Sequence, residues 1–304
     1  MRNLISCDQF TKVNLDELYN LADEIVSYPE AFKDKLKNKI VSTLFFEPST
    51  RTRLSFEAAA LKLGASVIST ENGSSGSSAV KGETLEDTIR VVMGYCDAIV
   101  IRHSEDDSSE RAAAVSKVPI INAGAGSGEH PTQALLDLYT IRAKRGCLNG
   151  LNVAVLGDLR YGRTIHSLLK LLSVYEGLTV YGLSKEQFAL PLKYINFLNS
   201  KGINYIICNN FDDIPRDVDV LYHTRIQKER FNSTLDSEKT NREDFEVTKQ
   251  VLDKFSDKTM LLHPLPRNNE ISVDVDVDPR ALFFEQAHNG IPIRMAVLLT
   301  VLKE

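Results

Sequence analysis

The chain has 304 residues, which is enough for two domains of about 150 residues each. With 43% hydrophobic and 25% charged residues, its composition is typical of a globular protein that buries sizeable cores. The net charge of −5 excludes a general nucleic-acid binder, because no basic excess neutralises a phosphate polymer, but it leaves room for a local anion pocket. No run of about eighteen apolar residues predicts a membrane-spanning helix, and Met1–Ile5 lacks the apolar core of a signal peptide.

The first half of the chain alternates strand-like and helix-like segments, which predicts a parallel sheet flanked by helices. Apolar spacing at Leu54, Ala58 and Leu61 indicates one of these helices, and Thr84 with Asp87 is typical of a helix start. The expected strands are 39–45, 98–102 and 118–122, and the expected helices are 51–63, 84–95 and 131–145. Segment 71–82, rich in Ser and Gly, is expected to be a mobile loop.

A second series of alternating segments begins near residue 149, so we expect two doubly wound α/β domains that meet near residues 130–150. The expected strands are 151–156, 178–183, 205–208, 218–222 and 260–262, and the expected helices are 162–173 and 292–302. The polar segment 227–244 has no apolar period and is expected to be a long surface loop.

Cysteine usage gives no sign of a metal site. The four cysteines are scattered and form no C-x-x-C pair, so we expect buried, reduced thiols in a cytosolic protein. They are Cys7, Cys96, Cys147 and Cys208.

The segment Ser49-Thr50-Arg51-Thr52-Arg53 lies between an expected strand and an expected helix. Ser49 or Thr50 can cap that helix, whose first N–H groups then point outward and bind anions together with the helix dipole. The hydroxyls of Ser49, Thr50 and Thr52 and the guanidinium of Arg51 add donors suited to phosphate oxygens. An ordinary capped helix with surface arginines is the alternative, and a Walker motif is absent from the sequence.

Other polar residues follow expected strands, where ligands of open α/β sheets bind. Arg102 is either a second phosphate clamp or a surface arginine, and His130, after the glycine-rich stretch 124–128, is either a ligand-binding or a structural histidine. Arg163 and Arg225 suit a dicarboxylic ligand, because arginine binds carboxylates in a bidentate, planar manner, or else they form surface ion pairs.

Several motifs together resemble the aspartate/ornithine carbamoyltransferase family. The segment F-F-E-P-S-T-R-T-R at 45–53 is similar to the carbamoyl-phosphate signature of that family. Further matches follow in order over nearly the whole chain: K-G-E-T at 81–84, R-H at 102–103, H-P-T-Q at 130–133, G-R-T at 162–164, T-R-I-Q at 224–227 and H-P-L-P-R at 263–267.

The resemblance implies transfer of a carbamoyl group from carbamoyl phosphate to the α-amine of L-aspartate. The products are N-carbamoyl-L-aspartate and phosphate, in an early step of de novo pyrimidine (UMP) biosynthesis. It further implies a carbamoyl-phosphate-binding domain of residues 1–131 plus 288–304 and an aspartate-binding domain of residues 132–287. The amine is the nucleophile, so the protein orients the substrates and stabilises charge.

Three other functions agree less well with the sequence. An ornithine pocket would offer acidic or thiol groups, and that branch typically shows H-C-L-P and an S-M-G loop, whereas this chain has H-P-L-P-R and T-R-I-Q. A non-catalytic binding module would show a broken phosphate or His130 motif. A nucleotide-binding oxidoreductase would need the G-x-G-x-x-G spacing, which segment 157–162 lacks.

By resemblance, His130 donates a hydrogen bond to the carbonyl oxygen of carbamoyl phosphate and Gln133 holds the carbamoyl NH₂ group. The residues implied for carbamoyl phosphate are Ser49, Thr50, Arg51, Thr52, Arg102, His130 and Gln133. Those implied for aspartate and the shared site are Ser77, Lys81, Arg163, Arg225, Gln227, Pro264 and Leu265. The catalytic set is Arg51, Thr52, Lys81, Arg102 and His130.

The resemblance also concerns assembly. It implies a cytoplasmic homotrimer in which Ser77 and Lys81 reach the active site of a neighbouring chain, and it leaves open separate regulatory subunits. Glu47 would pair with Arg163 or Arg230 when the domains close. No metal, organic cofactor, nucleic acid or membrane is expected as a partner.

Overall fold

The computed structural model describes residues 1–71, 82–226 and 245–303, and it divides into two compact units. Unit 1 comprises Met1–Leu136 and Asn289–Glu304, and unit 2 comprises Asp137–His288. The expected loop 227–244 and all but the two end residues of the expected loop 71–82 lie outside the described residues, and with them Ser77, Lys81, Gln227 and Arg230. In the part of the chain that the structure describes, no helix is long and apolar enough to cross a membrane.

Unit 1 is built on a four-stranded parallel sheet with the order β2-β1-β3-β4. The strands are β1 (Ile40–Phe45), β2 (Ser66–Glu71), β3 (Ala98–His103) and β4 (Ile120–Ala125). β2 forms one edge and is largely exposed, whereas β3 and β4 are almost wholly buried. Because parallel strands need crossover connections, a helix follows each strand.

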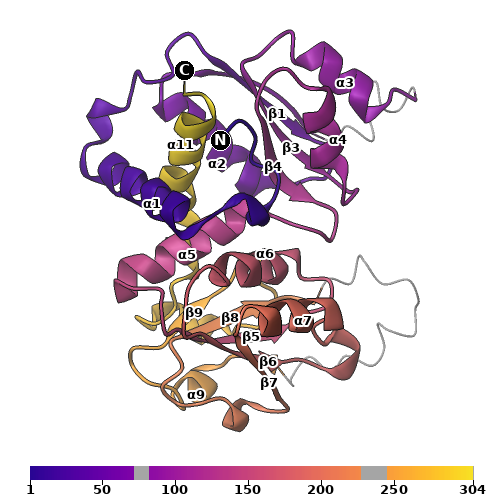
Figure 1. Ribbon diagram of the computed structural model, residues 1–304. Coiled ribbons are helices and arrows are strands. Elements are labelled where there is room, and N and C mark those ends of the chain that lie inside the picture. The colour runs from indigo at the N-terminus through magenta and orange to yellow at the C-terminus, as the bar shows by residue number, and fades with distance from the viewer. Residues whose placement is uncertain (72–81, 227–244, 304) are drawn as a thin grey trace. The chain divides into compact units, whose positions relative to one another are not determined.

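Helices cover both faces of this sheet (Figure 1). They are α1 (Lys12–Ser27), α2 (Thr50–Lys62), α3 (Leu85–Val92), α4 (Ser108–Val115), the start of α5 (Pro131–Arg145), and α11 (Gly290–Val301). α11 packs between α1 and α2, so the end of the chain returns to unit 1. α3 and α4 pack together, and Ile89 and Ala112 join the apolar cluster over β3.

The extent of α2 agrees with the expected helix, and its apolar residues differ in burial. Leu54 and Leu61 are 52% and 61% exposed, whereas Phe56 and Ala59 are fully buried. Phe56 lies under the guanidinium of Arg294 in α11, 5.1 Å from ring centroid to Cζ. Aromatic and small side chains therefore fill the α2–α11 contact, and the leucines form an apolar stripe on the surface.

Unit 2 contains a five-stranded parallel sheet with the order β7-β6-β5-β8-β9. The strands are β5 (Asn152–Gly157), β6 (Thr179–Leu183), β7 (Asn204–Cys208), β8 (Val220–Thr224) and β9 (Met260–Leu262). The helices are the remainder of α5, α6 (Arg163–Leu172), α7 (Leu192–Ser200), α9 (Lys249–Leu252) and α10 (Phe283–His288). The expected fold class, two parallel α/β sheets flanked by helices, is confirmed.

The cysteines are all free thiols, but the expectation that all are buried is wrong. Cys7 and Cys208 are buried and Cys96 is intermediate, whereas Cys147 is exposed, in the loop after α5. Burial beside Asp97 raises the pKa of the Cys96 thiol to about 11. That side chain is therefore a poor nucleophile at neutral pH.

Candidate active site

The expected phosphate segment begins α2 at the carboxyl end of β1. Ser49 occupies the N-cap, its carbonyl accepts the first helical hydrogen bond from the Arg53 amide at 3.0 Å, and its hydroxyl makes no capping bond to the described backbone. That hydroxyl is therefore not consumed by the helix, and the N–H groups of the first turn have no intrahelical acceptors. Thr50 and Arg51 are exposed and Thr52 is buried. This geometry suits a bound anion.

The two arginines of the segment differ in their surroundings. The Arg53 guanidinium lies 3.0 Å from the Glu71 carboxylate and 3.6 Å from that of Glu57. Glu57 in turn accepts a hydrogen bond from the Ser69 hydroxyl at 2.6 Å, so Arg53 ties α2 to β2. Arg51 extends from the exposed side of the first turn. Arg53 therefore has a structural role, and the exposed position of Arg51 at the helix N-terminus suits contact with a ligand.

Arg102 lies near the carboxyl end of β3, where the pairing with β4 shifts register. Such an irregularity redirects a side chain. The Arg102 side chain is buried, and it donates to the Glu47 carboxylate at 2.6 Å and to the Ala123 carbonyl at 3.3 Å. Glu47 precedes Ser49 in the same connection, so the phosphate segment and β3 share one ion pair. The expected pairing of Glu47 with Arg163 or Arg230 stays a prediction.

The loop between β4 and α5 is held in place by two acidic side chains. The Asp106 carboxylate accepts from the backbone N–H of Ser127 at 2.6 Å. The Glu129 carboxylate accepts from the backbone N–H of Cys7 at 2.6 Å. At Gly126, with φ +45°, an added Cβ would lie 1.9 Å from Asp106 Oδ1, so only glycine fits. The loop that leads to His130 is therefore rigidly anchored.

His130 and Gln133 lie at the start of α5, and both are buried. Nδ1 of His130 is 3.5 Å from the hydroxyl of Thr132, and the carbonyl of His130 accepts from the backbone N–H of Gln133 at 3.0 Å. His130 and Gln133 follow β4, Arg102 lies at the carboxyl end of β3, and Ser49 follows β1. Because carboxyl ends of parallel strands share one edge, the expected phosphate and carbamoyl residues gather at one edge of the unit 1 sheet.

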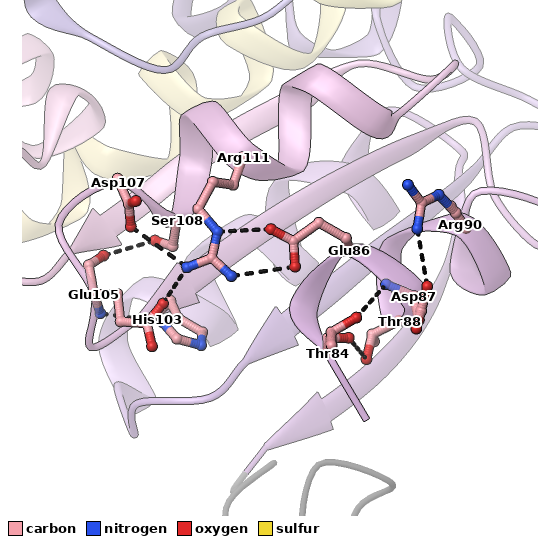
Figure 2. A network of polar contacts seen from close by, with 10 residues as sticks. All are labelled: Thr84, Glu86, Asp87, Thr88, Arg90, His103, Glu105, Asp107, Ser108 and Arg111. Carbon is pink, nitrogen blue, oxygen red and sulfur yellow. Dashed lines mark hydrogen bonds and ion pairs between the residues drawn. The ribbon is translucent and has the colours of Figure 1, made fainter. Parts of the chain in front are cut away.

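A polar network ties the start of α3 to the loop after β3 (Figure 2). Arg111 of α4 binds Glu86 of α3 through two hydrogen bonds, from Nε at 2.7 Å and from a terminal nitrogen at 3.1 Å. Arg111 also binds Glu105 and lies 3.5 Å from Asp107. Hydrogen bonding to Arg111 lowers the pKa of Glu86 to about 2. Sequence reasoning missed this support, because charged residues on α3 and α4 look like ordinary solvated faces.

In unit 2 the corresponding edge depends on a close approach of β5 and β8. Gly157 pairs with Thr224 and has φ +96°. A Cβ at Gly157 would lie 2.1 Å from the carbonyl oxygen of Thr224. The Thr224 hydroxyl is 3.3 Å from the carbonyl of Asp158, which locks the two strand ends together. Arg225 follows Thr224 directly, so this contact fixes where Arg225 leaves the sheet.

Arg163 begins α6 and is buried, and Gly162 is its N-cap. The preceding turn is held by the Asp158 carboxylate, which accepts from the backbone N–H groups of Arg160 and Tyr161 at 3.1 and 2.9 Å. Arg225 is half-buried. Two guanidinium groups thus follow β5 and β8 at one edge of the unit 2 sheet, which suits a ligand with two carboxylates.

Pro264 and Leu265 follow β9 at the same edge and are partly exposed. Leu265 has φ +55°, the left-handed region that non-glycine residues rarely adopt. Strained backbone of this kind persists only where neighbours hold it, and it is enriched at functional sites. Among the described residues, no group of three or more His, Cys, Asp or Glu side chains could hold a metal ion.

These features define a two-domain α/β protein in which each parallel sheet presents cationic and polar side chains at its carboxyl edge. A family model described as "Aspartate/ornithine carbamoyltransferase, carbamoyl-P binding domain" matches residues 2–143. A second, "Asp/Orn binding domain", matches residues 149–301. The chain therefore belongs to the aspartate/ornithine carbamoyltransferase family.

Individual relatives are similar over nearly the whole chain. The chloroplastic aspartate carbamoyltransferase of Arabidopsis thaliana is 45% identical over 99% of this chain and 78% of its own length. The catalytic subunit of aspartate transcarbamoylase from Methanocaldococcus jannaschii superposes with a TM-score of 0.91 at 43% identity, covering 99% of this chain and 98% of that one. Aspartate transcarbamoylase from Trypanosoma cruzi, solved with carbamoyl phosphate and aspartate, has a TM-score of 0.91 at 38% identity, covering 99% and 96%.

Proposed function

We propose that this chain is an aspartate carbamoyltransferase, which transfers the carbamoyl group of carbamoyl phosphate to L-aspartate in pyrimidine biosynthesis. Its relatives carry that name along nearly its full length. The observation that carries the proposal is that each unit has its own set of candidate ligand-binding groups: a helix N-terminus and buried Arg102 in unit 1, and Arg163 and Arg225 in unit 2. The first set suits a phosphate and the second a dicarboxylate.

The proposed chemistry needs no protein nucleophile. The aspartate α-amine attacks the carbonyl carbon, a C–N bond forms, and the C–O bond to phosphate breaks as the tetrahedral intermediate collapses. His130 donates to the carbonyl oxygen as it gains negative charge, and Arg51, Thr52 and Arg102 stabilise the departing phosphate. The amine loses its proton, for which the released phosphate is a suitable acceptor.

The remaining substrate contacts are assigned in the same proposal. Carbamoyl phosphate is bound by Ser49, Thr50 and Gln133 in addition to the residues above. Aspartate is bound by Arg163, Arg225, Gln227 and the backbone of Pro264 and Leu265. Orientation of the two reactants then supplies a large part of the rate enhancement.

The proposal includes a homotrimer with shared active sites, to which Ser77 and Lys81 of a neighbouring chain contribute. Two features support it: the apolar stripe of Leu54 and Leu61 on α2, and the exposed edge strand β2, which leads into the segment that carries Lys81. Exposed leucines at i and i+7 lie on one helix face and suit a protein contact. Separate regulatory subunits remain a candidate partner, and a cytoplasmic location is supported by the four free thiols.

Phosphate release from carbamoyl phosphate tests the function directly, measured with L-aspartate, with L-ornithine and without an acceptor. We expect release that depends on aspartate, together with formation of N-carbamoyl-L-aspartate. Release with ornithine alone would overturn the acceptor assignment. Equal release in all three mixtures would overturn the transferase assignment.

A further inference from the structure

The turn Pro264-Leu265-Pro266 contains one backbone N–H group, because proline has none. His263 Nδ1 accepts a hydrogen bond from that N–H of Leu265 at 2.8 Å. A backbone N–H always donates, so Nδ1 is the unprotonated nitrogen and the ring proton lies on Nε2. The His263 ring therefore occupies the single donor of a turn whose central residue has a left-handed conformation.

The opposite side of the ring fixes this tautomer. His263 Nε2 lies 2.9 Å from Oε1 of Glu270 and donates its proton there. Glu270 also accepts from the backbone N–H of Asn268 at 3.1 Å, so its carboxylate is held in place. Burial acts to raise the pKa of Glu270, but the bond to His263 and its other hydrogen bonds lower it overall, so the carboxylate is charged and accepts.

The backbone of His263 is anchored as well. Its N–H donates to the side-chain oxygen of Gln286 at 2.9 Å, and the Gln286 amide donates to buried Asp137 at 2.6 Å. The other oxygen of Asp137 accepts from the Tyr222 hydroxyl at 2.8 Å. His263 is itself 1% exposed, so it cannot contact a substrate from solvent. Its side chain hydrogen-bonds to Leu265 and to Glu270, and so holds the turn that follows it.

We propose that His263 is a positioning residue, and that its Nδ1 acceptor, with the tautomer set by Glu270, fixes the Leu265 backbone for recognition of the aspartate amine. This rests on the proposed function, in which the carbonyls of that turn accept from the amine. Loss of the Nδ1 acceptor leaves the Leu265 N–H without its bond and lets the turn relax. The aspartate site is then disturbed, while the carbamoyl phosphate residues of unit 1 are unaffected.

Two matched substitutions separate the two sides of the ring. In His263→Asn the side-chain oxygen occupies nearly the position of Nδ1 and can still accept from Leu265. In His263→Gln the amide occupies nearly the position of Nε2, so it can donate to Glu270 but does not satisfy Leu265. For His263→Gln we expect the KM for aspartate to rise roughly tenfold, the effect of one unsatisfied buried donor. The KM for carbamoyl phosphate should stay within about twofold, and His263→Asn should recover most of the loss.

Equal effects of the two substitutions on the aspartate KM, or an equal rise in both KM values, would overturn the proposal and make His263 a packing residue. A wild-type enzyme without aspartate-dependent phosphate release would overturn the proposed function instead, before any variant is compared. If His263→Gln does not fold, the tautomer remains measurable. The protein has six histidines, so the NMR signals of His263 in ¹⁵N-histidine-labelled wild type are identified as those that are lost in His263→Asn. These signals should show a protonated Nε2, and a protonated Nδ1 would contradict the proposal.

Discussion

Arg51 and Arg53 are two positions apart on one helix, yet they face different surroundings. Arg53 is bound by the carboxylates of Glu57 and Glu71, and Arg51 extends from the exposed first turn. We expect Arg51→Ala to lower kcat/KM for carbamoyl phosphate about 10²- to 10³-fold, because a donor to the developing phosphate charge is lost. Its midpoint of thermal unfolding should stay near that of the wild type. Steady-state kinetics and calorimetry measure both.

Lys62 gives the matched control, because it is an exposed cation at the other end of α2. Lys62→Ala should leave kinetics unchanged, and Arg53→Ala should lower the unfolding midpoint by losing its ion pairs to β2 and α2. Full activity of Arg51→Ala would show that the phosphate is bound elsewhere.

Where β5 and β8 come together, only glycine fits at position 157. We expect Gly157→Ala to destabilise the protein by roughly 1–3 kcal/mol, from its φ of +96°, and further because Cβ would meet the Thr224 carbonyl at 2.1 Å. The shift of Thr224 should also move Arg225 and raise the KM for aspartate. Gly202→Ala is the control, since Gly202 has φ +71° but nothing within 4 Å of an added Cβ. An unchanged aspartate KM in a folded Gly157→Ala protein would argue against this coupling.

The ion pair between α3 and α4 predicts a pH dependence. Arg111 lowers the pKa of Glu86 from 4.5 to about 2, so the charged carboxylate stabilises the folded state above pH 4.5. That stabilisation is lost as pH falls from 4.5 toward 2, where Glu86 is protonated in the folded protein as well. The stability difference between wild type and Glu86→Gln, from urea unfolding, should therefore be largest near neutral pH and shrink below pH 4.5. A constant difference from pH 7 to pH 3 would contradict this explanation.

Sequence patterns predicted strands that form apolar runs better than strands made mostly of polar residues. β3, β5 and β9 were expected within one or two residues, because their residues form short apolar runs. β2 was missed, since four of its six residues are polar and the strand lies at an exposed edge, and the apolar spacing of α2 did not indicate that Phe56 and Ala59 are buried while the leucines are exposed. Periodicity cannot distinguish an exposed apolar stripe from a core-facing one when both lie on one helix.

The candidate site, too, was predicted only in part from the sequence. Motif spacing indicated Arg102, His130, Arg163 and Arg225, and parallel topology explains why residues that follow different strands share an edge. The residues that hold them could not be predicted from the sequence. Asp106 and Arg111 bond to residues 21 and 25 positions away in the chain, and Glu270 bonds to His263 across a turn, and all three residue types are common on any surface.

At the scale of the whole molecule, shared active sites make a quantitative prediction. If each site takes Arg51 from one chain and Lys81 from its neighbour in a cyclic trimer, Arg51→Ala and Lys81→Ala chains should each be nearly inactive alone. After the two are denatured together in equal amounts and refolded, every mixed trimer has one site with both native residues. Random assembly then restores about a quarter of the wild-type activity.

Arg51→Ala mixed with Arg102→Ala is the control for that experiment. Both of these residues belong to unit 1 of the same chain, so no mixed trimer contains an intact site and no activity should return. Native mass spectrometry verifies that mixed trimers have formed. Activity no higher than the sum of the two parents, with mixed trimers present, would place Lys81 in the site of its own chain. Recovery near a quarter would instead require the segment after β2 to cross to a neighbouring chain, and the position of β2 at the exposed edge of the unit 1 sheet favours this.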